Sequence, residues 1–261
     1  MALILSKANR RYGFKASPKD EKDLPAKLAF SVDLNLPASV DLEQWMGPVK
    51  DQGQEGSCTA HAGTENLEFL YRKIKNQSPV FSPQFLYYKE REFDKSLPGD
   101  QGSYGRTSVK CMQQFGCDLL SDDPYDVQKM DEPPTEEQLT QALNYKAGAY
   151  HALKDVNEMK CCLASGFTFL IGFSVSDNFE TDISSDGIMP APSKNIIGGH
   201  EVLVIGYDDT KTDTKSGRTG YFKVRNSWGP SWGSNGNFFM SYSDILGVIS
   251  EAWIQHFGKP W

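Results

Sequence analysis

A cysteine at the start of a predicted helix is the residue of this sequence best placed for nucleophilic chemistry. Cys58 follows Gly56 and Ser57. After it, apolar or small residues recur at the spacing of one face of an amphipathic helix: Ala60, Gly63, Leu67, Leu70 and Ile74. The free N–H groups and positive dipole end of a helix N-terminus stabilise an anion, so a thiolate is favoured there. The alternative is a buried cysteine that packs as a small hydrophobic residue.

Three separated segments carry distinctive motifs: residues 52–58 (QGQEGSC), 199–207 (GHEVLVIGY) and 225–233 (RNSWGPSWG). In this chain order they resemble the catalytic regions of the papain family of cysteine peptidases. The third, with the pattern N-S-W-G-x-x-W-G, is the most specific. The resemblance extends from about residue 36 to the C-terminus, strong at these motifs and loose between them. It is to bacterial-type members with a short N-terminal extension.

The resemblance implies a catalytic triad. It assigns the nucleophile to Cys58, the general base and acid to His200, and the amide that orients the imidazole to Asn226. In such a site a thiolate attacks the peptide carbonyl and the imidazolium protonates the departing amine, which divides amide cleavage into acylation and hydrolysis of a thioester. This chemistry uses no metal or organic cofactor.

Two further residues match positions of the family motifs. Gln52, six residues before Cys58, matches the glutamine whose side-chain N–H joins a backbone N–H in binding the tetrahedral oxyanion. Its alternative is a solvated loop glutamine. Trp228 matches the tryptophan that shields the contact between Asn226 and His200 from water, beside the substrate, and a buried tryptophan is equally typical of a core.

The other histidines lie outside the motifs. His61 is a rival base on spacing alone, because residues three apart on a helix are neighbours and Cys58 lies three residues before it. No orienting partner or family motif supports it. His151 and His256 are expected to be surface or packing residues.

The sequence departs from the family pattern next to the nucleophile. Glu55 stands where members usually have a disulfide-bonded cysteine, so the resemblance implies that this disulfide is absent. Thr59 replaces the tryptophan that commonly follows the nucleophile. Neither change affects the triad.

The resemblance also suggests where substrate binds. Gly102 and Ser103 are candidates for the strip that pairs with the substrate backbone. Gly198, Gly199 and Glu201 flank the base near the pocket for the second residue upstream of the cut, where two small residues and an acid suggest a roomy, anionic pocket. The sequence favours the alternative that Glu201 points to solvent from a strand end.

Composition argues against several functional classes. A net charge of -7 argues against nucleic-acid binding, which needs clustered cations. No apolar stretch approaches the roughly 20 residues that span a bilayer, so no membrane partner is expected. The five cysteines cannot all pair within one chain and lack zinc-site spacing, so a free thiol and no metal are expected. Without a signal-peptide core the protein is expected to be a cytoplasmic monomer, or secreted if a leader was removed.

The residue pattern that predicts secondary structure changes near residue 167. Before it, patterns predict helices over 82–91, 107–115, 135–145 and 157–164; after it, they predict strands over 167–175, 200–207, 221–225, 238–242 and 248–255, with a hairpin loop over 208–220. Helices followed by strands indicate an α+β fold. The resemblance implies the papain-like form: a helical lobe over about 40–145, an antiparallel barrel-like lobe over about 146–261, and an active-site cleft between them.

The first 35 residues form a separate predicted segment. They hold seven Lys and Arg against four Asp and Glu, a charge of +3, which leaves -10 for residues 36–261. Opposite charges attract over a distance, and a tethered segment has a high effective concentration near the body. We expect this segment to lie along the groove as a short propeptide that partly blocks substrates; the alternative is a loose tail.

The predicted function is that of a cysteine peptidase, most simply an endopeptidase, that acts on peptides or proteins. Two other functions use the same fold. One is a catalytically silent protein that binds peptides or inhibits peptidases, and the other is an acyl transferase with the same triad. Loss of a triad residue would favour the silent protein, and all three residues are present.

Overall fold

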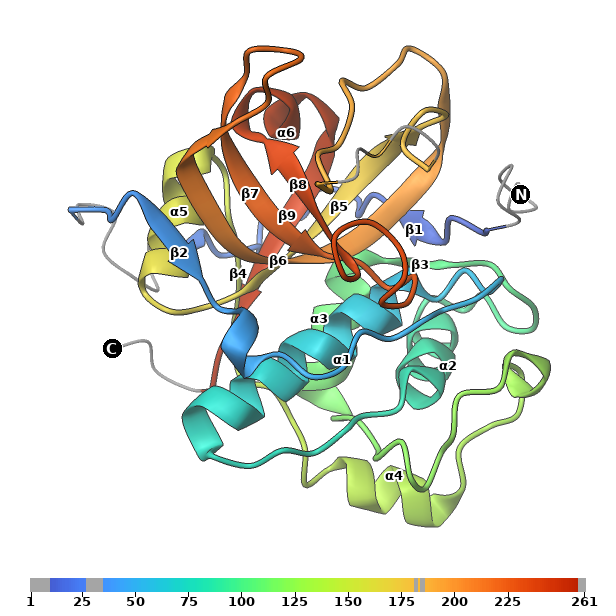
Figure 1. Ribbon diagram of the computed structural model, residues 1–261. Helices are drawn as coiled ribbons and strands as arrows, with labels where there is room; N and C mark the ends of the chain where they lie inside the picture. Colours follow the sequence, from blue (N-terminus) through green and yellow to red (C-terminus); the bar gives the residue numbers. More distant parts are fainter. Residues whose placement is uncertain (1–9, 27–34, 181–182, 184–185, 258–261) are drawn as a thin grey trace.

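The computed structural model describes residues 10–26, 35–180, 183 and 186–257, and these form two lobes. Figure 1 shows α5 (Val156–Ala164) at the left of the sheet and α6 (Tyr242–Val248) at its top, with the other four described α-helices below. Those four are α1 (Cys58–Leu70), α2 (Pro83–Phe93), α3 (Gly105–Gln114) and α4 (Glu136–Ala142). No helix in the described part of the chain is long and apolar enough to cross a membrane.

Local sequence signals set the ends of the helices. Ser82 caps α2 by accepting a hydrogen bond from the backbone N–H of Phe85, and Pro83 follows in the first turn. Thr135 and Gln138 form a reciprocal capping box at α4. Helix α1 continues into a π-helical turn, η3 (Tyr71–Lys75), which ends at Asn76 in the left-handed conformation.

The upper lobe is a seven-stranded sheet. Its order is β4 (Tyr150–Ala152), β9 (Ile249–Gln255), β5 (Phe169–Ser176), β6 (Ile196–Thr212), β7 (Thr219–Arg225) and β8 (Asn237–Ser241), with β2 (Ser39–Asp41) also paired to β6. Every pairing in this sheet is antiparallel. The antiparallel lobe expected from the sequence is therefore present, and β6 extends further at both ends than the predicted 200–207.

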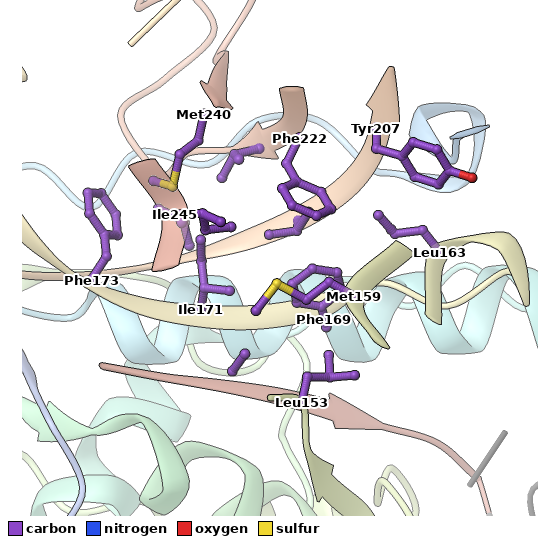
Figure 2. Packing of buried hydrophobic residues seen from close by; sticks show 14 of the residues in the cluster. Leu153, Met159, Leu163, Phe169, Ile171, Phe173, Tyr207, Phe222, Met240 and Ile245 are labelled. Carbon is purple, nitrogen blue, oxygen red and sulfur yellow. The ribbon is translucent and has the colours of Figure 1, made fainter. Parts of the chain in front are cut away.

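Each lobe has its own apolar core. In the upper lobe Met159 and Leu163 of α5 belong to the same cluster as Phe169 of β5, and Figure 2 shows Met159 beside Phe169. Phe169 meets Phe222 of β7 edge to face at 6.1 Å between ring centroids. The lower core packs α1, α2 and α3 together. Burial of each such side chain stabilises the fold by about 1.5–3 kcal/mol.

Helix α1 lies between these two cores. Phe69 and Leu70 belong to the upper core, whereas Leu67 belongs to the lower one. The helix that the sequence predicted from Cys58 onwards is present. All thirteen residues of α1 are buried, however, so the expectation of the solvent-exposed polar face that an amphipathic helix would have is wrong. Its polar side chains are paired inside the protein instead; Glu68, for example, accepts from the ammonium of Lys50 at 2.7 Å.

The N-terminal segment runs between the lobes. Its strand β1 (Phe14–Lys15) pairs in parallel with β3 (Ser103–Tyr104), which lies just before α3 (Figure 1). Further along, the backbone N–H of Ala152 donates to the carbonyl of Leu24. The segment is thus attached to both lobes over residues 10–26, while residues 1–9 and 27–34 lie outside the described part.

Candidate active site

Cys58 is the first residue of α1 and is fully buried. The preceding residue, Ser57, provides no side-chain cap, so the N-terminal N–H groups of the helix are not neutralised by a capping oxygen. The loop before it is held by Asp100, whose carboxylate accepts from the backbone N–H of Gly56 at 3.0 Å. The sequence thus places a thiol at a helix N-terminus.

His200 lies on β6 and is also fully buried. Its Nε2 is 2.8 Å from Oδ1 of Asn226, which directly follows β7. Nε2 therefore carries the proton that Oδ1 accepts, and Nδ1, which has no hydrogen-bond partner among the described residues, is left with its lone pair. The neighbouring residue, Glu201, has a backbone hydrogen bond to Cys58, so His200 and the thiol are adjacent.

Aromatic rings enclose the imidazole of His200. Trp228 stacks on it with 5.0 Å between centroids and an interplanar angle of 27°, and Phe173 approaches edge to face at 5.9 Å. Tyr12 of the N-terminal segment adds a third ring at 6.0 Å. The contact between His200 and Asn226 is therefore protected from water, as the family resemblance implied for Trp228.

Gln52 is buried, which argues against the solvated loop glutamine considered from the sequence. Its Nε2 donates to the carbonyl of Glu55 at 2.8 Å, and its Oε1 accepts from the hydroxyl of Ser227 at 2.6 Å. These bonds tie the loop before Cys58 to the loop after Asn226 and fix the orientation of the amide.

The remaining histidines do not join this cluster. His61 turns its Nδ1 to the carbonyl of Ser57 at 3.1 Å, and its ring meets Tyr125 edge to face. His151 and His256 stack with 5.2 Å between centroids, far along the sheet where β4 meets β9. They are buried packing residues, so the surface position considered for them is excluded.

The N-terminal segment passes directly over the thiol. A backbone hydrogen bond joins Gly13 to Cys58, and Gly13 lies so close to the carbonyl of Gly56 that a Cβ there would overlap it. On the other side, the backbone N–H of Ser103 donates to the carbonyl of Gly13 at 2.9 Å. A substrate backbone cannot occupy this position while Gly13 does.

Flanking residues of the segment anchor it in the groove. Arg10 pairs with Asp51 at 3.3 Å and lies over the ring of Trp228 at 4.8 Å, and Arg11 pairs with Asp100 at 3.0 Å. These ion pairs show the charge complementarity that the sequence predicted between the segment and the body.

The candidate substrate-binding residues line the same groove. Gly102 and Ser103 contact Gly13, and Gly199 lies against the ring of Phe14. Glu201 lies within β6 and is completely buried, so the favoured expectation that it points to solvent is wrong. The strand continues from residue 196 to 212, which places Glu201 inside the sheet rather than at its end.

Burial keeps the reactive groups neutral in this covered state. It raises the pKa of the Cys58 thiol to about 12, despite opposing backbone hydrogen bonds from Glu201 and Gly13. Burial also lowers the pKa of His200 to about 4, against the hydrogen bond to Asn226. The thiol and imidazole are therefore both uncharged near neutral pH while the segment is in place.

Comparison with known protein families and solved structures identifies the family to which this chain belongs. Residues 36–255 match the model of the papain family cysteine proteases. The chain belongs to the papain family. A solved member, xylellain from Xylella fastidiosa, has 31% sequence identity and a TM-score of 0.85, with 99% of each chain covered. The resemblance and the two-lobe α+β fold predicted from the sequence are confirmed.

Relatives in the papain family differ in length from this chain. An uncharacterized peptidase C1-like protein of Acanthamoeba polyphaga mimivirus is 30% identical, over 95% of this chain and 88% of that protein. Human cathepsin L2 is 29% identical over 78% of this chain and 60% of its own length. The chain thus spans less than two thirds of cathepsin L2.

Glu55 occupies the position where papain-family members usually have a disulfide-bonded cysteine, and here it makes a hydrogen bond instead. Glu55 is buried and accepts from the hydroxyl of Tyr125 at 2.7 Å, and burial raises its pKa to about 7. All five cysteines are buried and free. Thr59, at the other departure from the family pattern, donates to the buried carboxylate of Glu90.

Sequence reasoning missed the residues of the segment that enter the papain-like cleft. The ring of Tyr12 contacts His200, and Gly13 contacts Cys58. Phe14 lies against Gly199. The available signal was an aromatic–glycine–aromatic triplet after two arginines, in which only glycine permits the close approach at the centre. Net charge indicated where the segment would lie but not which residues would enter the site.

Proposed function

We propose that this member of the papain family is a cysteine endopeptidase that uses Cys58, His200 and Asn226. The observation that carries the proposal is the state of the imidazole: Nε2 is held by Asn226 at 2.8 Å and the buried Nδ1 remains available beside the thiol. A base with one nitrogen fixed and the other free to accept the proton of a neighbouring thiol is the arrangement that acyl transfer requires.

The reaction follows from these positions. Nδ1 of His200 takes the proton from Sγ of Cys58, and the thiolate attacks the peptide carbonyl carbon. Gln52 and the backbone N–H of Cys58 stabilise the oxyanion, and the imidazolium then protonates the departing amine as the C–N bond breaks. Nδ1 next takes a proton from water, which attacks the thioester and regenerates the thiol.

The N-terminal segment supports the assignment as an endopeptidase. Gly13 lies at the thiol, and the chain continues through the groove on both sides of it: Arg10 contacts Trp228 on one side, and Lys15 lies in β1 beside β3 on the other. A groove that holds a continuous chain on both sides of the nucleophile accommodates internal bonds of a polypeptide.

The same segment is proposed to regulate the enzyme as a short propeptide. It covers Cys58 and favours the uncharged thiol and imidazole, whereas catalysis needs the thiolate and imidazolium. Inhibition therefore has a steric part, through Gly13, and an electrostatic part, through burial. Release of the segment readmits water and lowers the cost of forming the ion pair.

The test uses the full-length chain and its Gly13→Ala variant. A Cβ at position 13 overlaps the Gly56 carbonyl, so the segment can no longer lie over the thiol. The substitution changes no residue of the two lobes. We expect Gly13→Ala to hydrolyse a fluorogenic peptide amide faster than wild type, and to be labelled faster at Cys58 by a peptidyl epoxide. Lys19→Ala, an exposed change in the same segment, is the control and should behave as wild type.

The outcomes separate the two parts of the proposal. Absence of turnover in every form, with labelling spread over all five cysteines, contradicts the peptidase. Turnover at equal rates in wild type and Gly13→Ala contradicts only the blocking segment. A chain shortened to residues 36–261, with its fold checked by circular dichroism, repeats the comparison, and product yield with and without an added amine separates hydrolysis from acyl transfer.

A further inference from the structure

The hydroxyl of Tyr125 contacts the loop that leads to Cys58. It lies 2.9 Å from the backbone carbonyl oxygen of Gln52, 2.7 Å from Oε2 of Glu55 and 2.8 Å from the hydroxyl of Ser57. One side chain thus contacts three of the six residues, 52–57, that precede the nucleophile. Because Gln52 carries the proposed oxyanion donor, Tyr125 contacts the backbone of that donor.

The lower lobe fixes Tyr125 in this position. The next residue, Asp126, donates its backbone N–H to Oε1 of Gln84 on α2 at 3.2 Å. The ring of Tyr125 meets His61 of α1 edge to face, with 4.8 Å between centroids. All of these contacts are made within residues 52–126, so they stay in place when the N-terminal segment leaves.

The hydroxyl of Tyr125 has more acceptors than hydrogens. A phenol has one hydrogen to donate, and burial raises the pKa of Tyr125 far above its ordinary value, so this hydrogen is retained. The carbonyl of Gln52 can only accept, and Glu55 can also only accept when it is ionised. The single hydrogen then goes to the carboxylate, which is nearer and charged. The carbonyl of Gln52 loses its donor in that state.

Protonation of Glu55 removes this competition. Its carboxyl group then donates its own hydrogen to the oxygen of Tyr125, and Tyr125 donates to the carbonyl of Gln52. The side chain of Gln52 returns to the same residue, because its Nε2 donates to the backbone carbonyl of Glu55 at 2.8 Å. Both the backbone and the side chain of Gln52 are therefore held when Glu55 carries a proton.

The surroundings of Glu55 favour its protonated form. Its side chain is buried, and its second oxygen, Oε1, has no hydrogen-bond partner in the part of the chain that the structure describes. Burial raises its pKa to about 7, and the charge of Asp100, which pairs with Arg11 of the segment, adds to this rise. Arg91 of α2 opposes it but is itself paired with Asp131 at 2.7 Å. The other titratable groups nearby are uncharged at neutral pH: Tyr125, Tyr87 of α2, and His61, whose pKa burial lowers to about 3.

We propose that Glu55 and Tyr125 are positioning residues that hold the backbone of Gln52 for oxyanion binding while Glu55 carries a proton. The inference rests on the proposed peptidase function and adds a control of the same site by pH. Both residues act through Gln52, whose amide must be in place before the oxyanion forms. Ionisation of Glu55 above neutral pH therefore lowers kcat and leaves KM little changed.

The kinetic test measures kcat and KM for a fluorogenic peptide in the Gly13→Ala background. Tyr125→Phe removes one hydroxyl, and loss of one such hydrogen bond should lower kcat roughly fivefold at about pH 6. Tyr207→Phe is the matched control, because its hydroxyl also donates to a backbone carbonyl, that of Pro37 at 2.7 Å, and it should keep kcat. In Gln52→Ala, Tyr125→Phe should have no further effect on kcat, and additive losses overturn the proposal.

Glu55→Gln distinguishes positioning from a structural role alone. The amide of glutamine donates to Tyr125 at every pH, as protonated Glu55 does. Glu55→Gln should therefore match the parent at about pH 6 and exceed its kcat roughly fivefold at about pH 8. Glu158→Gln, at a buried acid of α5, is the control and should keep the pH profile of the parent. Parallel profiles of the parent and Glu55→Gln overturn the proposal.

A second measurement works without turnover. Hydrogen exchange of the backbone amides of residues 52–58 is followed in the inactive Cys58→Ala chain and corrected for the intrinsic exchange rate at each pH. Protection should fall between about pH 6 and about pH 8, stay constant when Glu55→Gln is added, and be low at both values when Tyr125→Phe is added. This pattern without hydrolysis in any active-site form refutes the peptidase and keeps the role of Glu55. Hydrolysis with protection independent of pH refutes the role of Glu55 alone.

Discussion

The Nε2 atom of His200 lies 2.8 Å from Oδ1 of Asn226, and this bond determines which imidazole nitrogen is available for chemistry. Because Oδ1 only accepts, the proton is on Nε2, and Nδ1 carries the lone pair in a buried site. Asn226 also accepts from the backbone N–H of Ser227 at 2.9 Å through the same oxygen, so its amide is held in this orientation.

The first prediction concerns the triad. Cys58→Ala should abolish hydrolysis, His200→Ala should reduce it nearly as far, and Asn226→Ala should reduce it least, because the first two residues perform chemistry and the third orients a ring that Trp228 also holds by stacking. The measurement is kcat/KM for a fluorogenic peptide in the Gly13→Ala background, with Cys58→Ala as the blank.

His61→Ala is the matched control for His200→Ala. His61 lies in the same helix as Cys58 but directs Nδ1 to Ser57, and burial lowers its pKa to about 3. We expect it to retain activity. If His61→Ala is as inactive as His200→Ala while both remain folded by circular dichroism, the assignment of the base to His200 is wrong.

The second prediction concerns Gln52. Gln52→Ala should lower kcat more than it raises KM, by about 10²–10³ in kcat, because an oxyanion donor acts in the transition state rather than on bound substrate. Gln54→Ala, an exposed change of the same residue type in the same loop, is its control and should behave as wild type. A loss confined to KM in Gln52→Ala would assign this residue a structural role only.

The sequence predicted well where Cys58, His200 and Asn226 lie, because the local constraints on these positions are strong. A glycine-rich loop that leads into a helix places Cys58 at the N-terminus, and motifs around Asn226 and His200 stand at the ends of clear apolar runs. Tertiary position was harder to predict. Helix α1 has polar residues all along its length, and the spacing of its apolar residues gave no sign that a second lobe would bury the opposite face.

The error at Glu201 has the same origin. An acidic residue beside a strand of Val, Leu and Ile is normally exposed, and the sequence contains no local signal that β9 brings a second acid, Glu251, to the other side of Gly172. The position of these two acids on either side of Gly172 arises from register between strands that are about fifty residues apart in the chain, from residue 201 to 251. Periodicity within one strand cannot predict it.

The third prediction tests the ion pair that anchors the segment. Arg11 is partly exposed and binds Asp100, whose side chain is 2% exposed. Loss of such a pair costs about 1 kcal/mol, so Arg11→Ala should raise the rate of Cys58 alkylation by roughly fivefold at low salt. Lys19→Ala removes the same charge from an exposed position and is the control. The difference between wild type and Arg11→Ala should narrow as salt is raised, and a difference that is independent of salt would contradict an electrostatic anchor.

The last prediction is the pH dependence of segment release. Burial lowers the pKa of His200 from its ordinary 6.5 to about 4 in the covered state, so between these values the uncovered state binds more protons. Lowering the pH through this window therefore favours release of the segment. Below pH 4 His200 is protonated in both states, so its protonation no longer shifts the equilibrium towards release. At the other end, burial raises the pKa of Cys58 from 9.0 to about 12, so thiol ionisation favours release only above pH 9.

The measurement follows the rate of Cys58 labelling by iodoacetamide in wild type relative to Gly13→Ala. The intrinsic reactivity of the thiol at each pH affects both labelling rates equally and cancels in their ratio. The ratio therefore reports the free energy needed to displace the segment from Cys58. We expect wild type to approach Gly13→Ala on going from pH 7.5 to pH 5, with a gain on the order of tenfold from the protonation of His200. A ratio that stays constant over this range would show that His200 does not change its pKa on release, and that the segment inhibits by steric exclusion alone.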